Sequence, residues 1–353
     1  MAIDHVEIYG FRNLKNIEFN PSPSLTLLVG HNGQGKTNIL EALYLLLQGH
    51  SFRSHSDREL LPFGCSPDHT ISLSATVSDG DRQTQWNFRY GASTSRRKQN
   101  QQFYPTVIFS PDDLELSRGA PAARRQFLDT LLSGLDTRYA KAVRLYQRAV
   151  SQRNKALKDG HWSIAETFVP TILQQGQYLW IKRYNVYDQL MPIVQGLYRT
   201  ISIGEQVEAL YISGGSPGRI ESLASYEQLL RTRQAEERQR LITLVGPHRD
   251  DIQFTLNGHS MIQTGSQGQQ RTLALAIKLA TYQWLKQETN RVPLVLLDDV
   301  LSELDRDRRT AVLSHVADDQ AQTIVTDTEA RDFGQLDPVI YVIKEGAIFG
   351  DDG

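Results

Sequence analysis

Short runs of apolar and alternating residues at the start of the chain predict a strand-rich segment. Such runs, when bounded by turn-forming residues, are typical of β-strands. The expected strands are residues 2–9, 24–29, 71–77, 84–90 and 106–110. Leu25–Val29 runs directly into a glycine-rich loop, and the stretch after this loop, Asn38–Gln48, has a helical pattern. The chain therefore begins with strands and contains one strand–loop–helix unit.

The pattern changes after Gly119 and changes back after residue 240. Amphipathic helical patterns extend from Gly119 to about Asn185. Strand patterns then return, with a helical stretch among them. The expected elements are the strands Asp251–Asn257, Leu294–Asp298 and Thr323–Thr326 and the helix Gln269–Glu288, and Gln206–Ile212 is a possible earlier strand. We expect a head built from both ends of the chain (1–117 and 241–353) with an inserted, mainly helical arm (118–240).

The glycine-rich loop carries a phosphate-binding motif. Residues Gly30–Thr37 read GHNGQGKT, which fits G-x-x-x-x-G-K-[ST] in full and lies between a strand and a helix. Glycines let the backbone N–H groups and the helix N-terminus face phosphates, while Lys36 supplies a positive charge and Thr37 a hydroxyl for Mg²⁺. We expect this loop to bind ATP. The contacting residues would be Gly30, His31, Asn32, Gly33, Gln34, Gly35, Lys36 and Thr37.

A second motif supplies carboxylates. Leu294–Asp298 is an apolar run that ends in a carboxylate, as a Walker B strand does, and Asp299 follows at once. Asp298 would hold Mg²⁺ beside Thr37, and Asp299 would orient or deprotonate the attacking water. Lys36, Asp298 and Asp299 are the candidate catalytic residues.

A serine at the start of the helix before this strand points to the ABC-type class of ATPase heads. Ser266, Gln267, Gly268 and Gln269 occupy the place where that class has its signature loop, which binds the γ-phosphate held by the opposite subunit. Plain helix capping by Ser266 is the alternative. The signature interpretation predicts an ATP-dependent homodimer. Ser302, Glu303 and Asp305 fit the D-loop position near the same interface.

The charge of the whole chain says little about its partners, but the local charge of the arm is informative. The 353-residue chain has a formal net charge of −2, so a nucleic-acid binder must segregate its charges. Residues 118–185 contain 12 Lys or Arg against 4 Asp or Glu, and four cations recur at helical spacing: Arg138, Lys141, Arg144 and Arg148. They form either a DNA-contacting face or an ordinary solvated helix face. One cysteine, no secretory signal and no long apolar run predict a cytoplasmic protein without a membrane span.

Several stretches together resemble the bacterial RecF family of recombination-repair proteins over nearly the whole chain. They are Gly10–Leu14, Gly30–Thr37, Ser51–Arg53, Ser110–Leu116, Arg124–Asp129, Gly246–Asp251, Gly265–Arg271 and Leu297–Asp305. The resemblance implies an α/β P-loop ABC-type ATPase head, a mixed sheet flanked by helices plus an antiparallel β subdomain, with the inserted arm. It also places Arg12 and Asn13 near the base or ribose of ATP.

The function implied by the resemblance is ATP-dependent binding to single-stranded, gapped or junction DNA. The partners would be RecR and RecO, the downstream event RecA loading and the SOS response, and the enzyme activity a weak, DNA-stimulated ATPase used as a switch. A structural SMC-like ATPase, or an ABC-type regulatory ATPase that acts through protein partners without touching DNA, is the alternative.

Three sequence features separate this chain from transporter heads. Asp299 stands where ABC-type heads usually have Glu, so we expect slow turnover. The switch histidine is absent from the stretch Thr326–Thr328, where Thr326 is the available γ-phosphate sensor, and the segment Val107–Leu116 has no Q-loop glutamine. For His248 and Arg249 in GPHRDD, a structural hydrogen-bond network is favoured over catalysis.

Overall fold

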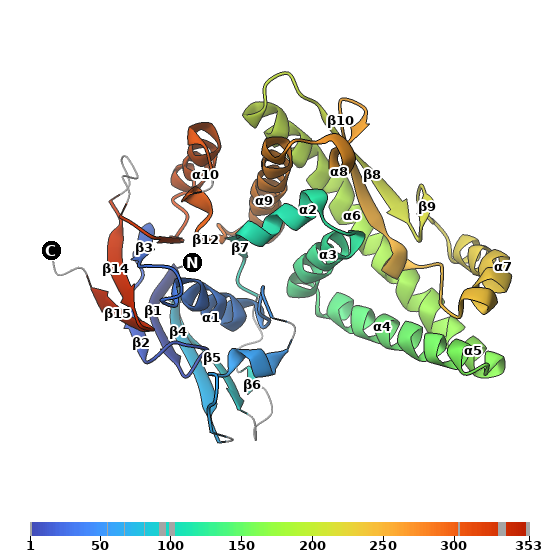
Figure 1. The fold of residues 1–353 in the computed structure, drawn as a ribbon, viewed down its shortest axis with the longest axis horizontal. Helices are drawn as coiled ribbons and strands as arrows, with labels where there is room; N and C mark the ends of the chain where they lie inside the picture. Colours follow the sequence, from blue (N-terminus) through green and yellow to red (C-terminus); the bar gives the residue numbers. More distant parts are fainter. Residues whose placement is uncertain are drawn as a thin grey trace. The chain divides into compact units, whose positions relative to one another are not determined.

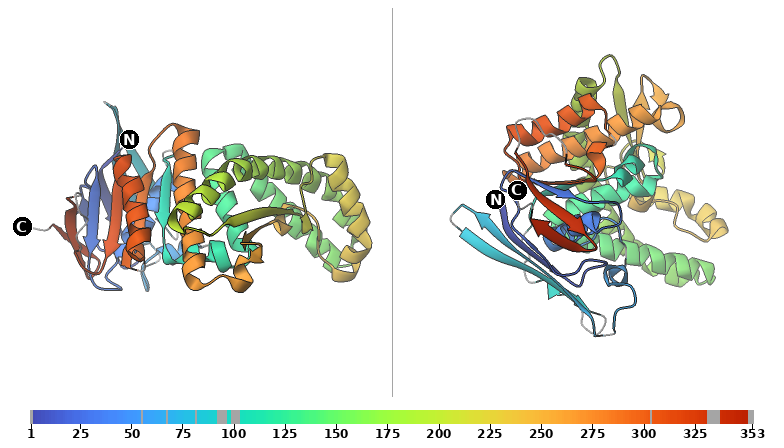
Figure 2. Two further views of the ribbon diagram at one scale, coloured as in Figure 1. Left: turned by 90° about the horizontal axis from the view of Figure 1, so that it is seen from above. Right: turned by 60° about the vertical axis from the view of Figure 1, so that its left-hand side comes forward.

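The computed structural model describes residues 2–54, 56–66, 68–80, 82–91, 97–98, 103–302, 304–330 and 337–350. The chain forms two compact units. The first comprises Met1–Asp112 together with Thr281–Gly353, and the second is Asp113–Ala280. Figures 1 and 2 follow the chain through both units in three views.

The first unit contains a six-stranded, mostly parallel sheet with the order β15-β14-β3-β13-β12-β7. Only β15 runs antiparallel to its neighbour. The strands are β3 (Leu25–Val29), β7 (Thr106–Phe109), β12 (Leu294–Asp298), β13 (Thr323–Asp327), β14 (Val339–Lys344) and β15 (Ala347–Gly350). Every residue of β7, β12 and β13 is buried, which explains their continuous apolar sequences, because parallel strands are covered on both faces.

A five-stranded antiparallel sheet with the order β2-β1-β4-β5-β6 belongs to the same unit. Its strands are β1 (Ala2–Tyr9), β2 (Ile17–Phe19), β4 (Thr70–Asp79), β5 (Arg82–Gly91) and β6 (Arg97–Lys98). In β4, buried residues alternate with half-buried ones because only one face of this sheet meets the core.

Helix α1 (Lys36–Gln48) lies between the two sheets and contacts strands of both. Its apolar residues join the inner faces of the sheets in one hydrophobic core. Buried Gln322 bonds to the backbone of Ile3 through both amide atoms (2.7 and 2.8 Å) and to Ser22 O (3.0 Å). The core and this amide fix the antiparallel sheet against the loop before β13. Helix α10 (Arg306–Asp318) completes the described helices of the unit, with the 3-10 turns Asp57–Leu60 and Val300–Ser302.

The second unit is mainly helical and carries a small antiparallel sheet of order β11-β10-β8-β9. Its helices are α2 (Leu114–Arg118), α3 (Pro121–Leu135), α4 (Thr137–Lys158), α5 (Trp162–Thr167), α6 (Val169–Ile201), α7 (Leu223–Arg240) and α8 (Met261–Thr264). Its strands are β8 (Val207–Ser213), β9 (Ser216–Pro217), β10 (Asp251–Leu256) and β11 (His259–Ser260). Helix α9 (Gln267–Thr289) begins in this unit, and its residues from Thr281 onward belong to the first.

A buried ion pair holds the second unit together. Arg183 Nη1 on α6 donates to Asp250 Oδ2 (2.7 Å), just before β10, and Arg183 Nη2 donates to Asp129 Oδ1 on α3 (2.8 Å). Asp250 also accepts hydrogen bonds from Trp180, Tyr211 and the Gly214 N–H. Because two of these partners lie on α6 and two lie on β8 or directly after it, this one carboxylate joins a helix to the small sheet.

Most of the expected elements are present within a residue or two of their expected ends. Elements without a strong pattern were not expected individually, among them β2, α10, β14 and β15. The compact middle unit reaches Ala280, beyond the expected arm boundary at residue 240. The physical reason is that β10 pairs with β8, and Asp250 bonds to Arg183, within the same unit.

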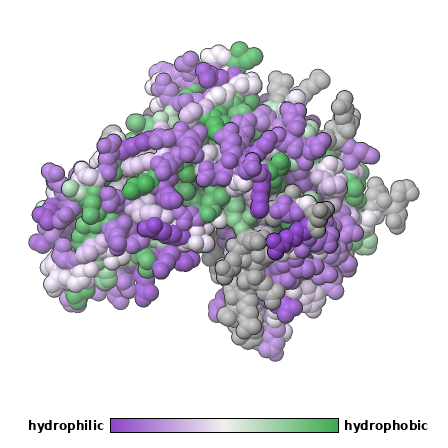
Figure 3. Space-filling view, turned by 180° about the vertical axis from the view of Figure 1, so that it is seen from behind, coloured by the Kyte–Doolittle hydropathy of each residue, from purple (hydrophilic) through white to green (hydrophobic). Residues whose placement is uncertain are grey.

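The surface drawn in Figure 3 is dominated by polar residues, with apolar ones in small groups among them. Among the described residues, no helix combines the length and apolar character needed to cross a membrane.

Replacing the buried carboxylate should destabilise the protein strongly. We expect Asp250→Asn to lower the free energy of unfolding by about 3–5 kcal/mol, because it leaves the buried Arg183 charge undercompensated. The matched control is Asp188→Asn, which removes an exposed ion pair with Arg219 and should cost about 1 kcal/mol at most. Urea unfolding at neutral pH measures both, and equal losses in the two variants would contradict the role given to Asp250.

Candidate nucleotide-binding site

The glycine-rich loop connects β3 to α1 in the first unit. Gly35 precedes α1 with a φ of 112°, a conformation that favours glycine, so the chain turns sharply into the helix. Lys36, which is buried, donates from Nζ to the carbonyl oxygens of Gly30 (2.6 Å) and His31 (3.3 Å). The lysine amine is therefore held over the loop, while His31, Asn32 and Gly33 are exposed at its tip.

The loop is fixed from outside by the β14–β15 turn and by the segment after β1. Gly346 N donates to Gln34 O (3.0 Å), and Glu345 N donates to the Gln34 side-chain oxygen (2.5 Å). Lys15 N donates in turn to Gly346 O (2.8 Å), and Asn13 Nδ2 donates to Gly33 O (3.1 Å). The loop conformation thus depends on chain segments from both termini.

The carboxylates of the second motif meet the first turn of α1. Thr37 Oγ1 donates to Asp298 Oδ1 at 2.7 Å, and Asp299 Oδ1 lies 4.0 Å from Lys36 Nζ. Thr326 at the end of β13 donates to Asp298 Oδ1 (3.1 Å) and accepts the Asp299 N–H (2.8 Å). Lys36, Thr37, Asp298, Asp299 and Thr326 therefore form one cluster, although more than 250 residues separate its two ends in sequence.

The chemistry of this cluster suits a hard divalent cation. Burial raises the pKa of Asp298, and the Asp299 charge raises it further, while the Thr37 and Thr326 hydroxyls lower it. Burial and the neighbouring Asp299 charge disfavour the ionised form of Asp298, and a nearby cation would stabilise that form. A hydroxyl and a carboxylate in contact are the oxygen ligands that Mg²⁺ prefers.

Glu41 is a site residue that the sequence analysis missed. It is fully buried on α1 and pairs with Arg12 Nε (2.5 Å), while Ser51 Oγ donates to it (2.5 Å) and Arg53 lies 3.9 Å away. The sequence signal is a lone acid in an otherwise apolar helix, one turn after Thr37. Glu41 fixes the orientation of Arg12, the residue expected near the base or ribose.

An open cleft of about 1480 Å³ lies beside the loop in the first unit. Polar and basic side chains that line it include Arg12, Asn13, Asn38 and Arg53, and aromatic ones include Tyr9, Phe63 and Tyr90. Asn38 Nδ2 donates to Asn13 Oδ1 (2.6 Å), which ties the cleft to the first turn of α1. The cleft is large enough to hold a nucleoside, and its lining offers both polar groups and aromatic rings.

The predicted signature residues belong to the second unit. Ser266 Oγ accepts the Gln269 N–H (3.2 Å) and Gln269 Oε1 accepts the Ser266 N–H (2.8 Å), so the two residues cap α9 reciprocally. Gln269 also donates to Glu205 (2.6 Å). Gln267 and Gly268 form the first turn of α9. The capping alternative is thus present in the geometry, and the role of these residues across a dimer interface stays a prediction.

The predicted D-loop residues have local contacts. Ser302 Oγ donates to the carbonyl oxygen of Asp299 (2.7 Å), next to the carboxylate cluster. Asp305 caps α10 by accepting the Arg308 N–H (3.0 Å). Glu303 lies outside the described residues.

The basic residues of the arm share one exposed helix face. Arg138, Lys141, Arg144 and Arg148 all lie on α4 and are exposed. Asp136 caps this helix, and Arg138 stacks over the Tyr178 ring at 4.6 Å from its centre. The predicted helix and its charged stripe are confirmed, whereas DNA contact by the stripe stays a prediction.

The GPHRDD segment is a structural network, as expected. His248 Nδ1 lies 2.7 Å from the Tyr146 hydroxyl and its Nε2 lies 3.0 Å from Thr243 O. Burial lowers the pKa of His248 to about 4, so the ring is neutral at pH 7.

A methyl group at Gly346 should disturb the phosphate loop more than one at Gly64. Both glycines have positive φ values (71° and 72°), so alanine at either site adopts a left-handed conformation at a cost of about 1–2 kcal/mol. At Gly346 the new Cβ would also lie 2.1 Å from Asn13 O, whereas Gly64 has open space. We expect Gly346→Ala to lose about 1–3 kcal/mol more stability than Gly64→Ala in urea unfolding. Equal losses would show that the close approach of Gly346 to Asn13 does not limit stability.

Comparison with known proteins agrees with this geometry. The sequence profile of the RecF/RecN/SMC N-terminal domain matches residues 2–348. The DNA replication and repair protein RecF of Desulfitobacterium hafniense is 37% identical to this chain, and the match spans 99% of each of the two proteins. RecF of Heliobacterium modesticaldum is 35% identical, again over 99% of each chain.

Solved structures give the same result. The recombination mediator protein RecF of the RecFOR pathway, solved with ATPrS, superposes with a TM-score of 0.89 at 28% identity, over 99% of this chain and 98% of that one. The Smc head domain of Pyrococcus furiosus bound to the C-terminal domain of ScpA, at 16% identity and a TM-score of 0.53 over 98% and 95%, shares the fold. The chain has the α/β fold of a P-loop ABC-type ATPase head with an inserted helical part, and it belongs to the RecF family.

Proposed function

We propose that this protein is an ATP-dependent DNA-binding protein of recombinational repair and replication. The single observation that carries the nucleotide part is the 2.7 Å hydrogen bond between Thr37 and Asp298, which joins the phosphate loop to the carboxylate strand. The repair function is supported by relatives named DNA replication and repair protein RecF that match the chain over nearly its full length.

The residues of the first unit fit Mg-ATP. The Gly30–Thr37 backbone and Lys36 would hold the phosphates, and the mixed cleft lined by Arg12 and Asn13 would hold the nucleoside. Thr37 and Asp298 would ligate Mg²⁺, which supplies charge neutralisation between the phosphate oxygens when bound. A similar protein has been solved with ATP, at 27% identity and a TM-score of 0.87.

We propose that hydrolysis is slow and serves to release the protein from DNA. Asp299 would orient or deprotonate the attacking water, but its side chain is one methylene shorter than the glutamate usual in this class. Thr326, which bonds to both Asp298 and Asp299, takes the place of the switch histidine.

The functional form in this proposal is an ATP-dependent homodimer. Ser266 and the N-terminus of α9 would reach the γ-phosphate held by the second copy, since a helix N-terminus favours anions. The D-loop residues near Asp299 would lie close to the same boundary.

The α4 stripe is the proposed contact for single-stranded, gapped or junction DNA. Its four exposed cations give the sequence-independent phosphate contacts that DNA binding requires. RecR, RecO and RecA are the proposed partners, with RecA loading and SOS induction downstream. A regulatory ATPase that acts through protein partners alone is the second candidate, because Arg138 is already engaged with Tyr178 within the fold.

Removing the loop lysine should weaken nucleotide binding. We expect Lys36→Ala to weaken ATP binding by at least tenfold, because the amine is the only predicted side-chain cation over the phosphates. The control is Lys344→Ala, which removes an exposed lysine at the end of β14 in the same unit. Fluorescent ATP-analogue titration measures both, and unchanged affinity in Lys36→Ala would refute the phosphate-site assignment.

Changing the signature serine should uncouple DNA binding from ATP. We expect Mg-ATP to dimerise the wild type and tighten its binding to a gapped duplex at fixed salt. Ser266→Arg should keep ATP affinity yet stay monomeric, because a long cation replaces the γ-phosphate ligand. Light scattering and fluorescence anisotropy provide the two readouts. Dimerisation of Ser266→Arg by ATP would leave Ser266 as a helix cap alone.

A charge variant in the same assay separates direct DNA contact from the second candidate. Arg144→Gln with Arg148→Gln should reduce the slope of log affinity against log salt by about 1 per side chain. The control, Arg231→Gln with Arg240→Gln, makes the same charge change on α7 and should leave the slope unchanged. Equal slopes in both double variants would favour a function through protein partners.

A further inference from the structure

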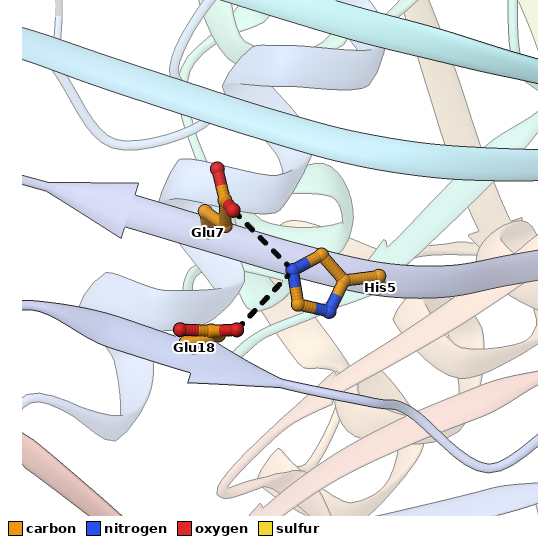
Figure 4. Close-up of side chains that lie close together, drawn as sticks. All are labelled: His5, Glu7 and Glu18. Carbon is orange, nitrogen blue, oxygen red and sulfur yellow. Dashed lines mark hydrogen bonds and ion pairs between the residues drawn. The ribbon is translucent and has the colours of Figure 1, made fainter.

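Three metal-ligating side chains meet on the antiparallel sheet of the first unit, away from the nucleotide site. His5 and Glu7 lie on β1, and Glu18 lies opposite on β2 (Figure 4). His5 Nε2 is 3.4 Å from Glu7 Oε1 and 3.7 Å from Glu18 Oε1. We propose that these three residues form a binding site for Zn²⁺ or a similar transition metal.

The strand register places two carboxylates opposite each other, where a positive charge would stabilise them. Glu7 and Glu18 are direct cross-strand partners in the β1–β2 ladder, and like charges directly opposite one another destabilise a sheet. His5 is two residues before Glu7, so it lies on the same face of β1. A cation shared by the three side chains removes the repulsion between the two carboxylates.

Neighbouring residues hold the ligands in place. Asn20 Oδ1 lies 2.8 Å from His5 Nδ1, and since an amide oxygen only accepts, Nδ1 carries a proton and Nε2 is the nitrogen that faces the two glutamates. Ser74 Oγ on β4 donates to Glu7 Oε2 (2.6 Å), which leaves Oε1 turned toward His5. Tyr341 fixes the backbone of Asn20 (3.0 Å). Outer partners of this kind are what orient metal ligands in proteins.

The distances and the ligand types select the metal. In a tetrahedral zinc site with bonds of about 2.0–2.1 Å, two ligand atoms are about 3.3–3.4 Å apart, close to the two distances here. An imidazole nitrogen with two carboxylates suits Zn²⁺ or Co²⁺, whereas Mg²⁺ and Ca²⁺ take oxygen ligands. The site uses none of the phosphate-loop residues, so it is independent of the proposed ATP function.

The side chains leave the fourth coordination position open to solvent. His5 is 31% exposed, Glu7 60% and Glu18 73%. A metal here would join edge strand β2 to β1, because Glu18 belongs to one and His5 and Glu7 to the other. Zn²⁺ binding should therefore stabilise the folded protein as well as occupy the site.

The test is Zn²⁺ binding by the full-length, tag-free and metal-stripped protein. Isothermal calorimetry in millimolar Mg²⁺ should give one Zn²⁺ per chain for the wild type, and Co²⁺ should give the strong visible absorption of a tetrahedral site. We expect His5→Ala and Glu18→Gln each to weaken Zn²⁺ binding by about tenfold or more. Glu288→Gln makes the same charge change as Glu18→Gln on an exposed part of α9 and is the matched control.

Thermal unfolding gives a second readout that does not depend on calorimetry. Zn²⁺ should raise the unfolding temperature of the wild type and of Glu288→Gln but not that of His5→Ala. The proposal is overturned if the wild type binds no Zn²⁺, or if His5→Ala and Glu18→Gln bind it as tightly as Glu288→Gln does. In either case the three side chains form an ordinary surface ion-pair cluster.

Discussion

The parallel pairing of β3, β13 and β12 is the constraint on which the proposed nucleotide site depends. Parallel strands present their carboxyl ends at the same sheet edge, so residues that follow each strand are brought together there. Lys36 and Thr37 come after β3, Asp298 ends β12, and Thr326 lies near the end of β13. The hydrogen bonds among them are consequences of this pairing, and none could form if β13 did not insert between the other two strands.

Two further sets of contacts fix the conformation of the loop and of Arg12 at this sheet edge. The β14–β15 turn reaches Gln34 in the loop, so the last described strands of the chain fix the conformation of a loop near its start. On α1, buried Glu41 forms ion pairs with Arg12 and Arg53 and accepts a hydrogen bond from Ser51. A buried carboxylate is unfavourable unless it is paired, so these contacts are needed for stability as much as for positioning Arg12.

The sequence predicted what depends on local pattern and missed what depends on long-range pairing. Strands β3, β12 and β13 are continuous apolar runs, and the loop motif specifies its own strand and helix neighbours, so these elements and the positions of Lys36 and Asp298 beside them were predictable. β14 and β15 were missed because their residues are largely half-buried or exposed, which leaves a weak pattern. The extent of the compact middle unit to Ala280 was not predicted, because the pairing of β10 with β8 joins segments that look unrelated in sequence. Glu41 was missed because its partners, Arg12 on one side and Ser51 and Arg53 on the other, come from two segments that lie before and after α1 in the chain.

The backbone conformation at Asp299 affects where its short side chain lies relative to the phosphate loop. Asp299 has a φ of 52°, in the left-handed region that is unfavourable for a residue other than glycine. Its N–H is held by Thr326 Oγ1, and Ser302 Oγ donates to its carbonyl oxygen, so the surroundings maintain the strained conformation. In this conformation the carboxylate lies 4.0 Å from the Lys36 amine. The backbone conformation thus brings this short side chain near the phosphate loop, and it would compensate for the missing methylene if Asp299 has the proposed role. The same threonine that holds Asp299 also bonds to Asp298, so a substitution at Thr326 would alter the positions of both carboxylates together.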